Sequence, residues 1–215
     1  MKPVANGSVS LTDVQTWENI QFQGAGFDAW GLSLTNNSLP YLDAPTAYAW
    51  VFGDNQSSNL KSPLRSYTSV GTYNATLRVQ DQGGTWSETQ IHAINVSDDT
   101  EPVPIITVNN VVVEDNLTLL TGQRILFSAG RTVDNVPIDN LDFQWNWGDG
   151  TQSGGIGVYA QQHEWDEIDG ESESFNLTVT VSDGINVGMK TIMVHINNRI
   201  PVYVFYDTVT TLIYT

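Results

Sequence analysis

Apolar residues recur at every second position over much of this chain, and this alternation limits the folds that it can adopt. In residues 73–79 and again in 175–181 the odd positions are apolar and the even positions are polar. Successive side chains of a β-strand point to opposite faces, so each segment is expected to bury one face and expose the other. No window shows the apolar spacing of an amphipathic helix. We therefore predict an all-β protein. Shorter alternating runs lie at residues 20–22, 48–52, 125–127, 143–147 and 192–196.

The alternating strands fall into two sets that can be aligned with each other. The sequence WVFGD at residues 50–54 matches WNWGD at 145–149, which lies 95 residues later. Further on, YNATLRVQD at 73–81 matches FNLTVTVSD at 175–183, which lies 102 residues later. The second copy therefore carries a longer connection after its first motif. A period of about 100 residues fits two complete β-sandwiches in tandem.

A polar run that contains two prolines separates the two sets at residues 97–104. Such runs are typical of domain boundaries. We predict one sandwich over residues 1–98 and a second, with a longer acidic loop, over 99–199. Residues 200–215 are too few to fold alone, and they are expected either to begin a further unit or to form a strand exchanged with a neighbouring molecule.

The repeated motif has a structural interpretation that needs no ligand. Trp50 and Phe52 lie two positions apart and can both enter a core, while Gly53 gives the backbone freedom for a tight reversal. The Asp54 side chain can accept nearby backbone N–H bonds. Tyrosines at such corners commonly donate their hydroxyl to the backbone. On this basis the structural positions are Trp50, Gly53, Asp54, Tyr67, Tyr73 and Asp81, with Trp145, Gly148, Asp149, Phe175 and Asp183 in the second copy.

These residues resemble the pattern of polycystic-kidney-disease (PKD) domains. In that family a W-D-F-G-D-G turn is followed by a P-x-H-T-Y segment and then by G-x-Y-x-V-x-L-x-V-x-D. The first copy shows all three blocks, at residues 50–55, 63–67 and 71–81. The second copy keeps the outer two blocks, but offers QHEW at 162–165 within its acidic insertion. The resemblance implies two tandem immunoglobulin-like (PKD-type) β-sandwiches.

Composition excludes several classes of function. Eight Lys and Arg against 24 Asp and Glu give a net charge of -16, which repels a nucleic-acid backbone. The chain has no cysteine, so disulfides and thiol chemistry are absent. No stretch of 18 apolar residues could insert into a membrane, and no nucleophile, zinc or phosphate-binding motif occurs. We expect no enzymatic activity from this segment.

Acidic clusters without nearby lysine suit a hard cation, because calcium takes oxygen ligands. We consider calcium the one cofactor that this sequence could hold, and some PKD-like modules bind it. The spacing matches no EF-hand, and a solvated acidic loop is the alternative. The candidate ligands are Asp98, Asp99 and Glu101 near the expected boundary, and Asp166, Asp169 and Glu171 in the acidic loop.

Seven N-x-S/T sequons occur, about twice the number expected from composition, and they suggest N-linked glycosylation of an exported protein. The alternative is that Asn and Thr simply favour exposed strand faces here. The acceptor asparagines are Asn6, Asn36, Asn55, Asn74, Asn95, Asn116 and Asn176.

We predict a non-catalytic extracellular module that acts as a spacer, adhesin shaft or lattice element on a cell surface, with archaea among the expected sources. Its partners would be neighbouring domains, or an extracellular polysaccharide or protein. One alternative is an accessory module of an extracellular hydrolase, in which exposed Trp30, Trp86 or Trp165 stacks on sugar. A second is a filament subunit that assembles by strand complementation.

Overall fold

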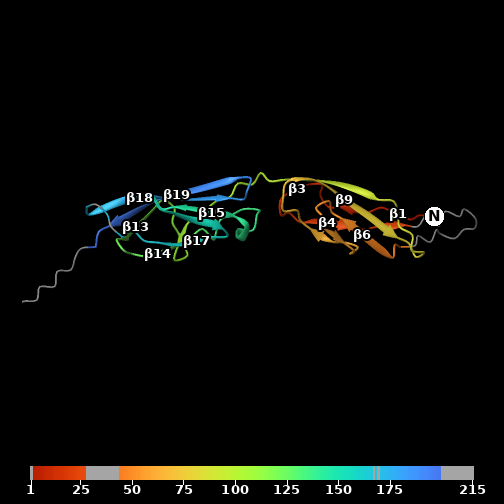
Figure 1. Ribbon diagram of the computed structural model, residues 1–215, viewed down its shortest axis with the longest axis horizontal. Helices are drawn as coiled ribbons and strands as arrows, with labels where there is room; N and C mark the ends of the chain where they lie inside the picture. Colours follow the sequence, from red (N-terminus) through yellow and green to blue (C-terminus); the bar gives the residue numbers. More distant parts are fainter. Residues whose placement is uncertain (1, 28–43, 167, 169, 200–215) are drawn as a thin grey trace, which may run out of the picture. The chain divides into compact units, whose positions relative to one another are not determined.

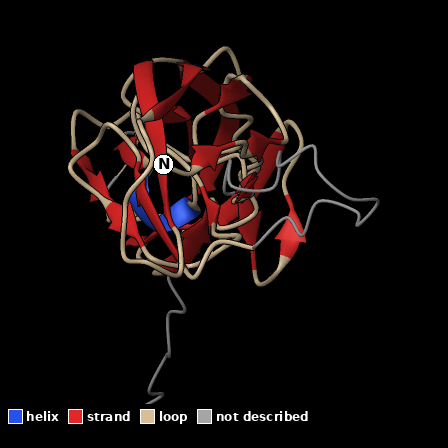
Figure 2. Cartoon of the chain, turned by 90° about the vertical axis from the view of Figure 1, so that its right-hand side faces the viewer, coloured by secondary structure: helices blue, strands red, loops and turns tan. Residues whose placement is uncertain are grey.

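The computed structural model describes residues 2–27, 44–166, 168 and 170–199, and it divides into two compact units. The first unit holds the residues up to 102 with the segments 133–141 and 182–187, and the second holds the remainder. Both are built from strands (Figure 1; Figure 2). Among the described residues the only helical element is the single 3-10 turn η2 (Ile138–Asn140), and no helix there is long and apolar enough to span a membrane.

The first unit packs a five-stranded sheet against shorter strands. The sheet has the order β3-β10-β9-β6-β7, and the facing layer consists of a β2-β4-β8 sheet and the β1-β5 pair. The strands are β1 (Val4–Ala5), β2 (Ser8–Val9), β3 (Asp13–Gln15), β4 (Ile20–Gln23), β5 (Gly26–Phe27), β6 (Ala47–Val51), β7 (Ser57–Ser58), β8 (Leu64–Arg65), β9 (Gly71–Gln80) and β10 (Gln90–Ser97).

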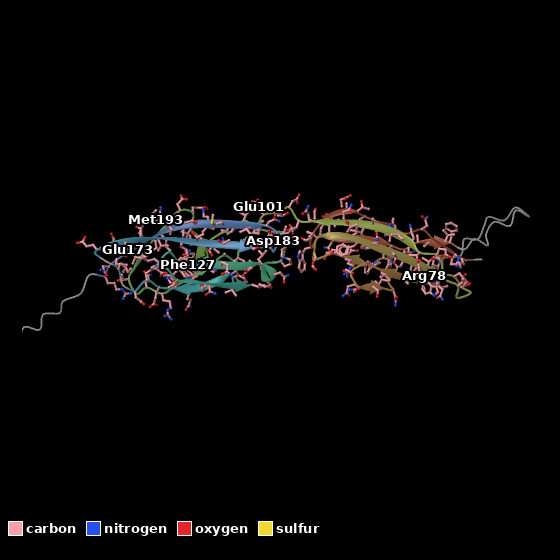
Figure 3. All side chains as sticks on the ribbon, turned by 45° about the horizontal axis from the view of Figure 1, so that its top comes forward. Arg78, Glu101, Phe127, Glu173, Asp183 and Met193 are labelled. Carbon is pink, nitrogen blue, oxygen red and sulfur yellow. The ribbon has the colours of Figure 1, made fainter. Side chains whose placement is uncertain are left out.

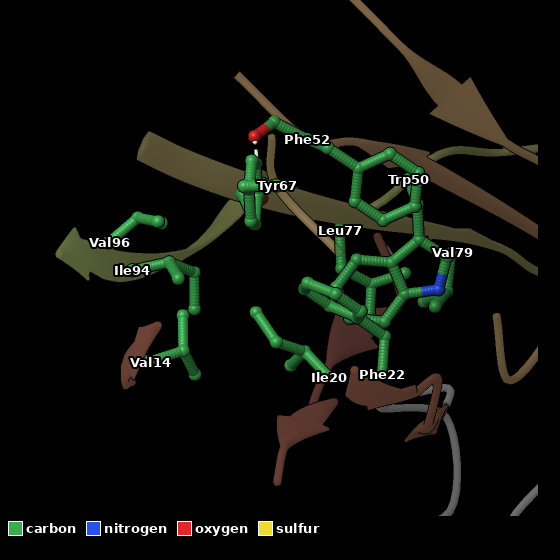
Figure 4. Close-up of a cluster of buried hydrophobic side chains, with 11 residues drawn as sticks. Val14, Ile20, Phe22, Trp50, Phe52, Tyr67, Leu77, Val79, Ile94 and Val96 are labelled. Atoms are coloured by element: carbon green, nitrogen blue, oxygen red, sulfur yellow. Dashed lines mark hydrogen bonds between the residues drawn. The ribbon is translucent and has the colours of Figure 1, made fainter. Parts of the chain in front are cut away.

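Aromatic rings form the centre of the first core (Figure 4). The ring of Phe22 meets Trp50 edge-on at 5.2 Å and Phe52 at 5.0 Å between centroids. Leu77 and Val79 on β9 are fully buried, whereas the intervening Arg78 is exposed. Burial of such rings contributes both apolar area and favourable edge contacts. The core positions predicted from the alternation are therefore confirmed in this unit.

The second unit is also a sandwich of two sheets. One has the order β12-β11-β14-β17 and the other the order β13-β19-β18-β15-β16. The strands are β11 (Thr107–Val108), β12 (Val111–Val112), β13 (Asn116–Leu120), β14 (Ile125–Ser128), β15 (Asp142–Asn146), β16 (Gln152–Ile156), β17 (Ala160–His163), β18 (Ser172–Ser182) and β19 (Val187–Asn197).

The second core repeats the plan of the first with larger rings. Trp145 and Trp147 stack at 5.4 Å between centroids, and Phe127 meets Trp147 at 5.5 Å. All three side chains are buried, and Figure 3 places Phe127 between the strand layers. The all-β fold of two tandem immunoglobulin-like sandwiches, predicted from the sequence, is confirmed.

Both five-stranded sheets have an edge strand that runs parallel to its neighbour. In the first unit β3 pairs in parallel with β10, from Asn95 opposite Asp13 to Ser97 opposite Gln15. In the second unit β13 pairs in parallel with β19, from Asn116 opposite Met193 to Leu120 opposite Asn197. The first parallel run covers three residue pairs and the second covers five. The pairs β9–β10, β6–β9 and β15–β16 are antiparallel.

Candidate functional site

The repeated turn motif is a structural device in the first unit. Gly53 has φ +84°, and a Cβ there would lie 3.0 Å from the Asn74 nitrogen, so only glycine fits this reversal. Asp54 accepts a hydrogen bond from the Gln56 backbone N–H at 3.1 Å. Its other oxygen forms an ion pair with Arg65, whose guanidinium lies 4.8 Å above the Phe52 ring. The carboxylate is therefore fully engaged within the fold.

The second unit builds the same turn with different partners. Gly148 also has φ +84°. Asp149 accepts hydrogen bonds from the Thr151 N–H at 2.8 Å and from the Thr151 hydroxyl at 2.6 Å. Its second oxygen lies 2.7 Å from His163 Nε2. The His163 ring stacks on Trp147 at 4.3 Å.

These bonds outweigh the effect of burial on Asp149. Desolvation acts to raise the pKa of this carboxyl, but hydrogen bonds from Thr151 and His163 favour the charged form and together hold the pKa below its ordinary value. Asp149 is therefore an ionised structural group with its acceptor sites filled, and not a general acid.

The segment around His163 corrects one expectation. The sequence predicts that residues 162–165 belong to the acidic loop, but residues 160–163 form β17, which pairs with β14. Trp165 is only 3 % exposed and stacks with Phe175 at 5.8 Å, as Tyr67 stacks with Tyr73 at 4.3 Å in the first unit. The apolar area of the indole explains the burial. Trp165 is thus unable to stack on a sugar.

The remaining motif residues hold turns and corners. Tyr67 donates its hydroxyl to the Phe52 carbonyl at 2.8 Å, and Tyr73 donates to the Ser69 carbonyl at 2.9 Å. Asp81 accepts from the Thr85 N–H at 2.8 Å, and Asp183 accepts from the N–H groups of residues 185 and 186 at 2.6 Å. The two aspartates complete backbone turns, and the two tyrosines attach their rings to backbone carbonyls.

A buried polar cluster in the first unit surrounds Asp98, one of the predicted calcium ligands. Asp98 is 9 % exposed and accepts hydrogen bonds from the Thr16 hydroxyl and, at 3.2 Å, from Asn135 Nδ2. The Asn186 amide donates to the carbonyl oxygens of Asp98 and Thr100, both at 3.2 Å. Only Asp98 was expected here, because its neighbours come from distant parts of the sequence.

Two oxygen atoms of this cluster have no hydrogen-bond partner within the described residues. They are Asp134 Oδ2 and Asn135 Oδ1, and both are inaccessible to solvent. Burial raises the pKa of Asp134, and the neighbouring carboxylates of Asp183 and Asp98 raise it further. Buried acceptors normally find a donor or a cation. These two oxygen atoms are therefore able to accept a further hydrogen bond or to coordinate a cation.

The other predicted calcium ligands do not join this cluster. Asp99 and Glu101 are exposed, and so are Asp166 and Glu171. Asp169 lies outside the described residues. In the part of the chain that the structure describes, no group of three or more His, Cys, Asp or Glu side chains is arranged to hold a metal ion. A cation here would need amide or backbone oxygens beside the carboxylates.

All the sequon asparagines that the structure describes are exposed. Four of them stand on the outward faces of the five-stranded sheets, and the other two lie outside the strands. Asn95 is partly engaged, because its amide donates to Asp13 at 2.9 Å and accepts from the Thr72 hydroxyl at 3.2 Å. Asn36 lies outside the described residues. The exposed acceptors are Asn6, Asn55, Asn74, Asn95, Asn116 and Asn176.

The remaining tryptophans suggested for sugar stacking offer no open platform. Trp86 is half-buried, and the Arg78 guanidinium lies 5.4 Å from its ring centre. Trp30 lies outside the described residues. A serine and histidine pair, Ser174 and His195, is joined by a 2.8 Å hydrogen bond on an exposed strand face. Because the pair lies on an open surface, we interpret it as an ordinary contact between side chains of neighbouring strands.

Comparison with known proteins shows that part of the first unit is similar to a known domain family. Residues 32–96 match the family model described as PKD domain. The PKD1 domain of the Vibrio cholerae metalloprotease PrtV is 28 % identical over 45 % of this chain and 99 % of that chain, with a TM-score of 0.34. The PKD1 domain of Vibrio anguillarum Epp is 26 % identical over 45 % and 98 %, with a TM-score of 0.33. Fibronectin(III)-like modules of Clostridium thermocellum CbhA are 13 % identical over 91 % and 94 %, with a TM-score of 0.32. The chain therefore contains a PKD-type domain, which is matched over residues 32–96.

Proposed function

We propose that this chain is a non-catalytic extracellular spacer whose units resist tension along the polypeptide. The observation that carries the proposal is the parallel pairing of β3 with β10 and of β13 with β19. In each unit the first strand of the five-stranded sheet thereby lies beside the last strand. A pull on the two ends of a unit then moves these neighbours in opposite directions.

This geometry loads the strand hydrogen bonds in shear. The bonds in a parallel pair are evenly spaced along the strands, so a sliding force acts on all of them together instead of opening them one by one. At the two ends of the β13–β19 pairing, the Met193 N–H donates to the Asp115 carbonyl at 2.8 Å and the Thr121 N–H donates to the Asn197 carbonyl at 3.0 Å. They indicate that the odd-numbered residues of β13 bond to β19.

Single-molecule stretching of the full chain tests the proposal. We expect two unfolding events, each releasing on the order of 30 nm, because a unit of about 100 residues extends at about 3.5 Å per residue. The second unit, with five parallel pairs, should yield at the higher force. Two events at forces no higher than those of an antiparallel, unzipping geometry would contradict a load-bearing role.

A pair of proline variants makes this test specific. Leu117→Pro removes an N–H that faces β19 and should lower the higher unfolding force. Thr118→Pro is the matched control, since its N–H faces away from β19 on an edge strand, where proline is tolerated. Leu117→Ala separates the loss of the side chain from the loss of the bond. Equal effects of the two prolines would remove the link between β13 and mechanical strength.

An extracellular, microbial cell-surface setting is part of the proposal. Its support is the PKD match at residues 32–96, together with the exposure of the sequon asparagines of the first unit, Asn6, Asn55, Asn74 and Asn95. Glycans on such positions would project into solvent. Detection of the protein on intact cells by surface proteolysis tests this setting, and full protection of the protein in intact cells would refute it.

Calcium binding is a second candidate function, favoured by the unpartnered oxygens of Asp134 and Asn135. With Asp98 they form a set of carboxylate and amide oxygens of the kind that calcium prefers. Bound calcium would stabilise the first unit by mass action. We expect millimolar calcium to raise the melting temperature of the wild type more than magnesium does, and to have little effect on Asp134→Asn. No shift in the wild type, or an equal shift in the variant, would exclude the site.

A carbohydrate-binding accessory role has less support from the described residues. Of the tryptophans considered for stacking, Trp165 is buried and Trp86 is covered by Arg78. Retention of the chain on insoluble polysaccharide, lost on substitution of Trp30, would restore this alternative. Strand complementation by residues 200–215 falls outside the described residues and stays a prediction.

A further inference from the structure

The outward surface of the β13-β19-β18-β15-β16 sheet carries almost no charge. Along β18 and β19 its outward side chains are Asn, Ser, Thr, Met, His and Val, and Asp142 at the start of β15 is the only acidic residue among the outward positions of the five strands. Glu114, which precedes β13, pairs with Lys190 of β19. We call this surface the neutral face. Its residues are Asn116, Thr118, Leu120, Asp142, Gln144, Asn146, Gln152, Gly154, Ile156, Ser174, Asn176, Thr178, Thr180, Met189, Thr191, Met193 and His195.

Large apolar side chains stand out on the neutral face. Met189 is 68 % exposed, Met193 is 43 % exposed and Ile156 is 72 % exposed. Figure 3 shows Met193 on the outer side of the strands that cover Phe127. Interface cores are depleted in charge and enriched in methionine, whereas free surfaces of monomers are rich in charged residues. The pattern is that of a contact surface.

We propose that the neutral face is a docking surface for a second copy of this chain. The argument for this occupant is electrostatic. Two molecules that each carry a charge of -16 repel one another at most orientations. They can approach closely only through a surface that lacks acidic groups. A foreign partner would more readily use the large negative charge through complementary basic residues.

The size of the neutral face suits a dimer. β18 and β19 have 11 residues each, which at about 3.3 Å per residue extend roughly 36 Å. Five strands about 4.8 Å apart span roughly 19 Å between the outer strand axes. Because β13, β15 and β16 have only five residues each, the face offers on the order of 500 to 600 Å² per molecule, which two copies can use to reach the roughly 1,000 Å² that a specific interface needs. In a two-fold dimer, Met189 and Met193 would each pack against the same face of the partner copy.

Sedimentation of the full chain tests the proposal. We expect reversible dimerisation that becomes tighter as salt rises, because salt screens the repulsion between the negative chains. Met189→Lys with Met193→Lys should weaken the dimer roughly tenfold or more by placing desolvated charges in the contact. Leu126→Lys with Val111→Lys is the matched control, because these exposed residues lie on the other sheet and the change in net charge is the same.

Methionine oxidation provides a second readout without substitution. Met189 and Met193 should react with dilute peroxide more slowly at dimer-forming concentration than at low concentration, relative to Met1, the third methionine of the chain. A chain that stays monomeric at high salt and about 0.1 mM overturns the proposal, and so does equal weakening by the control pair. Concentration-independent oxidation of Met189 and Met193, or mass spectrometry that finds oligosaccharide on Asn176, would also overturn it.

Discussion

His163 in the second unit takes the place that Arg65 holds in the first. Each residue ends a short strand, and the two short strands pair with corresponding strands of their units. His163 of β17 lies opposite Ile125 of β14, and Arg65 of β8 lies opposite Ile20 of β4. Each lies beside the aromatic residue of the turn motif and forms a polar contact with the motif aspartate. The two units therefore fill one structural position with two different nitrogen-bearing side chains.

This equivalence predicts how substitutions of His163 behave. His163→Ala removes the stack on Trp147 and the bond to Asp149, and should destabilise the second unit by about 1 to 2 kcal/mol. His163→Arg should recover most of that loss, because arginine also stacks and pairs with carboxylates. Chemical denaturation at pH 7 measures both. An arginine variant as unstable as the alanine variant would show that the two positions are not equivalent.

Asp149 should contribute stability that disappears in acid. Its pKa is lower in the folded chain than its ordinary value of 3.8, so the contribution is present above pH 4 and is lost as the pH falls through the lowered value. Asp149→Asn should be less stable than the wild type at pH 6, and this difference should shrink as the pH is lowered from about 5 to about 2. Asp115→Asn, at an exposed position, is the control. A difference that does not change with pH would refute the assignment.

The stability that Tyr67 contributes should be lost at alkaline pH, in contrast to that of Asp149. Burial, and after it the charge of Asp54, raise the pKa of Tyr67 to about 12. Because the folded value lies above the unfolded one, stability is complete below about pH 10 and is lost as the pH rises towards 12. Tyr67→Phe should cost roughly 1 to 2 kcal/mol at pH 7, because the Phe52 carbonyl loses its donor.

The same variant should also lose less stability than the wild type between pH 10 and pH 12. Tyr73→Phe is the matched control, since its hydroxyl bonds to an exposed backbone carbonyl. Thermal unfolding followed by near-ultraviolet circular dichroism at each pH supplies the comparison. Parallel pH curves for Tyr67→Phe and the wild type would remove Tyr67 as the source of the alkaline transition.

Local rules predicted most of the fold. Alternation placed Leu77 and Val79 in the core because a strand has a period of two. The motif alignment placed Gly53 and Gly148 in equivalent turns, and both have φ +84°. Asn55 replaces the glycine of the motif and adopts φ +67°, as expected of asparagine.

Features that depend on distant contacts were missed. The cluster around Asp98 joins Thr16 and Asn186, which lie more than 80 residues away in each direction. No local pattern signals such a meeting. The strand that ends at His163 was hidden by the acidic residues that follow it, which suggested a loop. The alternation also identified the outward residues of β19 without showing that Met189 and Met193 would stand on a surface almost free of charge.

Gly154 on β16 gives the sharpest test of the packing in the second unit. It has φ +155°, and a Cβ there would lie 2.0 Å from the Phe143 carbonyl oxygen. Backbone atoms of the neighbouring strand cannot move aside as a flexible side chain does, so Gly154→Ala should destabilise the unit by roughly 3 kcal/mol or more.

Gly150→Asn is the control. Nothing lies within 4 Å of a Cβ at Gly150, and the aligned Asn55 already adopts a left-handed conformation. This variant should stay within about 1 kcal/mol of the wild type. Denaturant titration that ranks the two variants equally would show that β16 is not held against β15 as described.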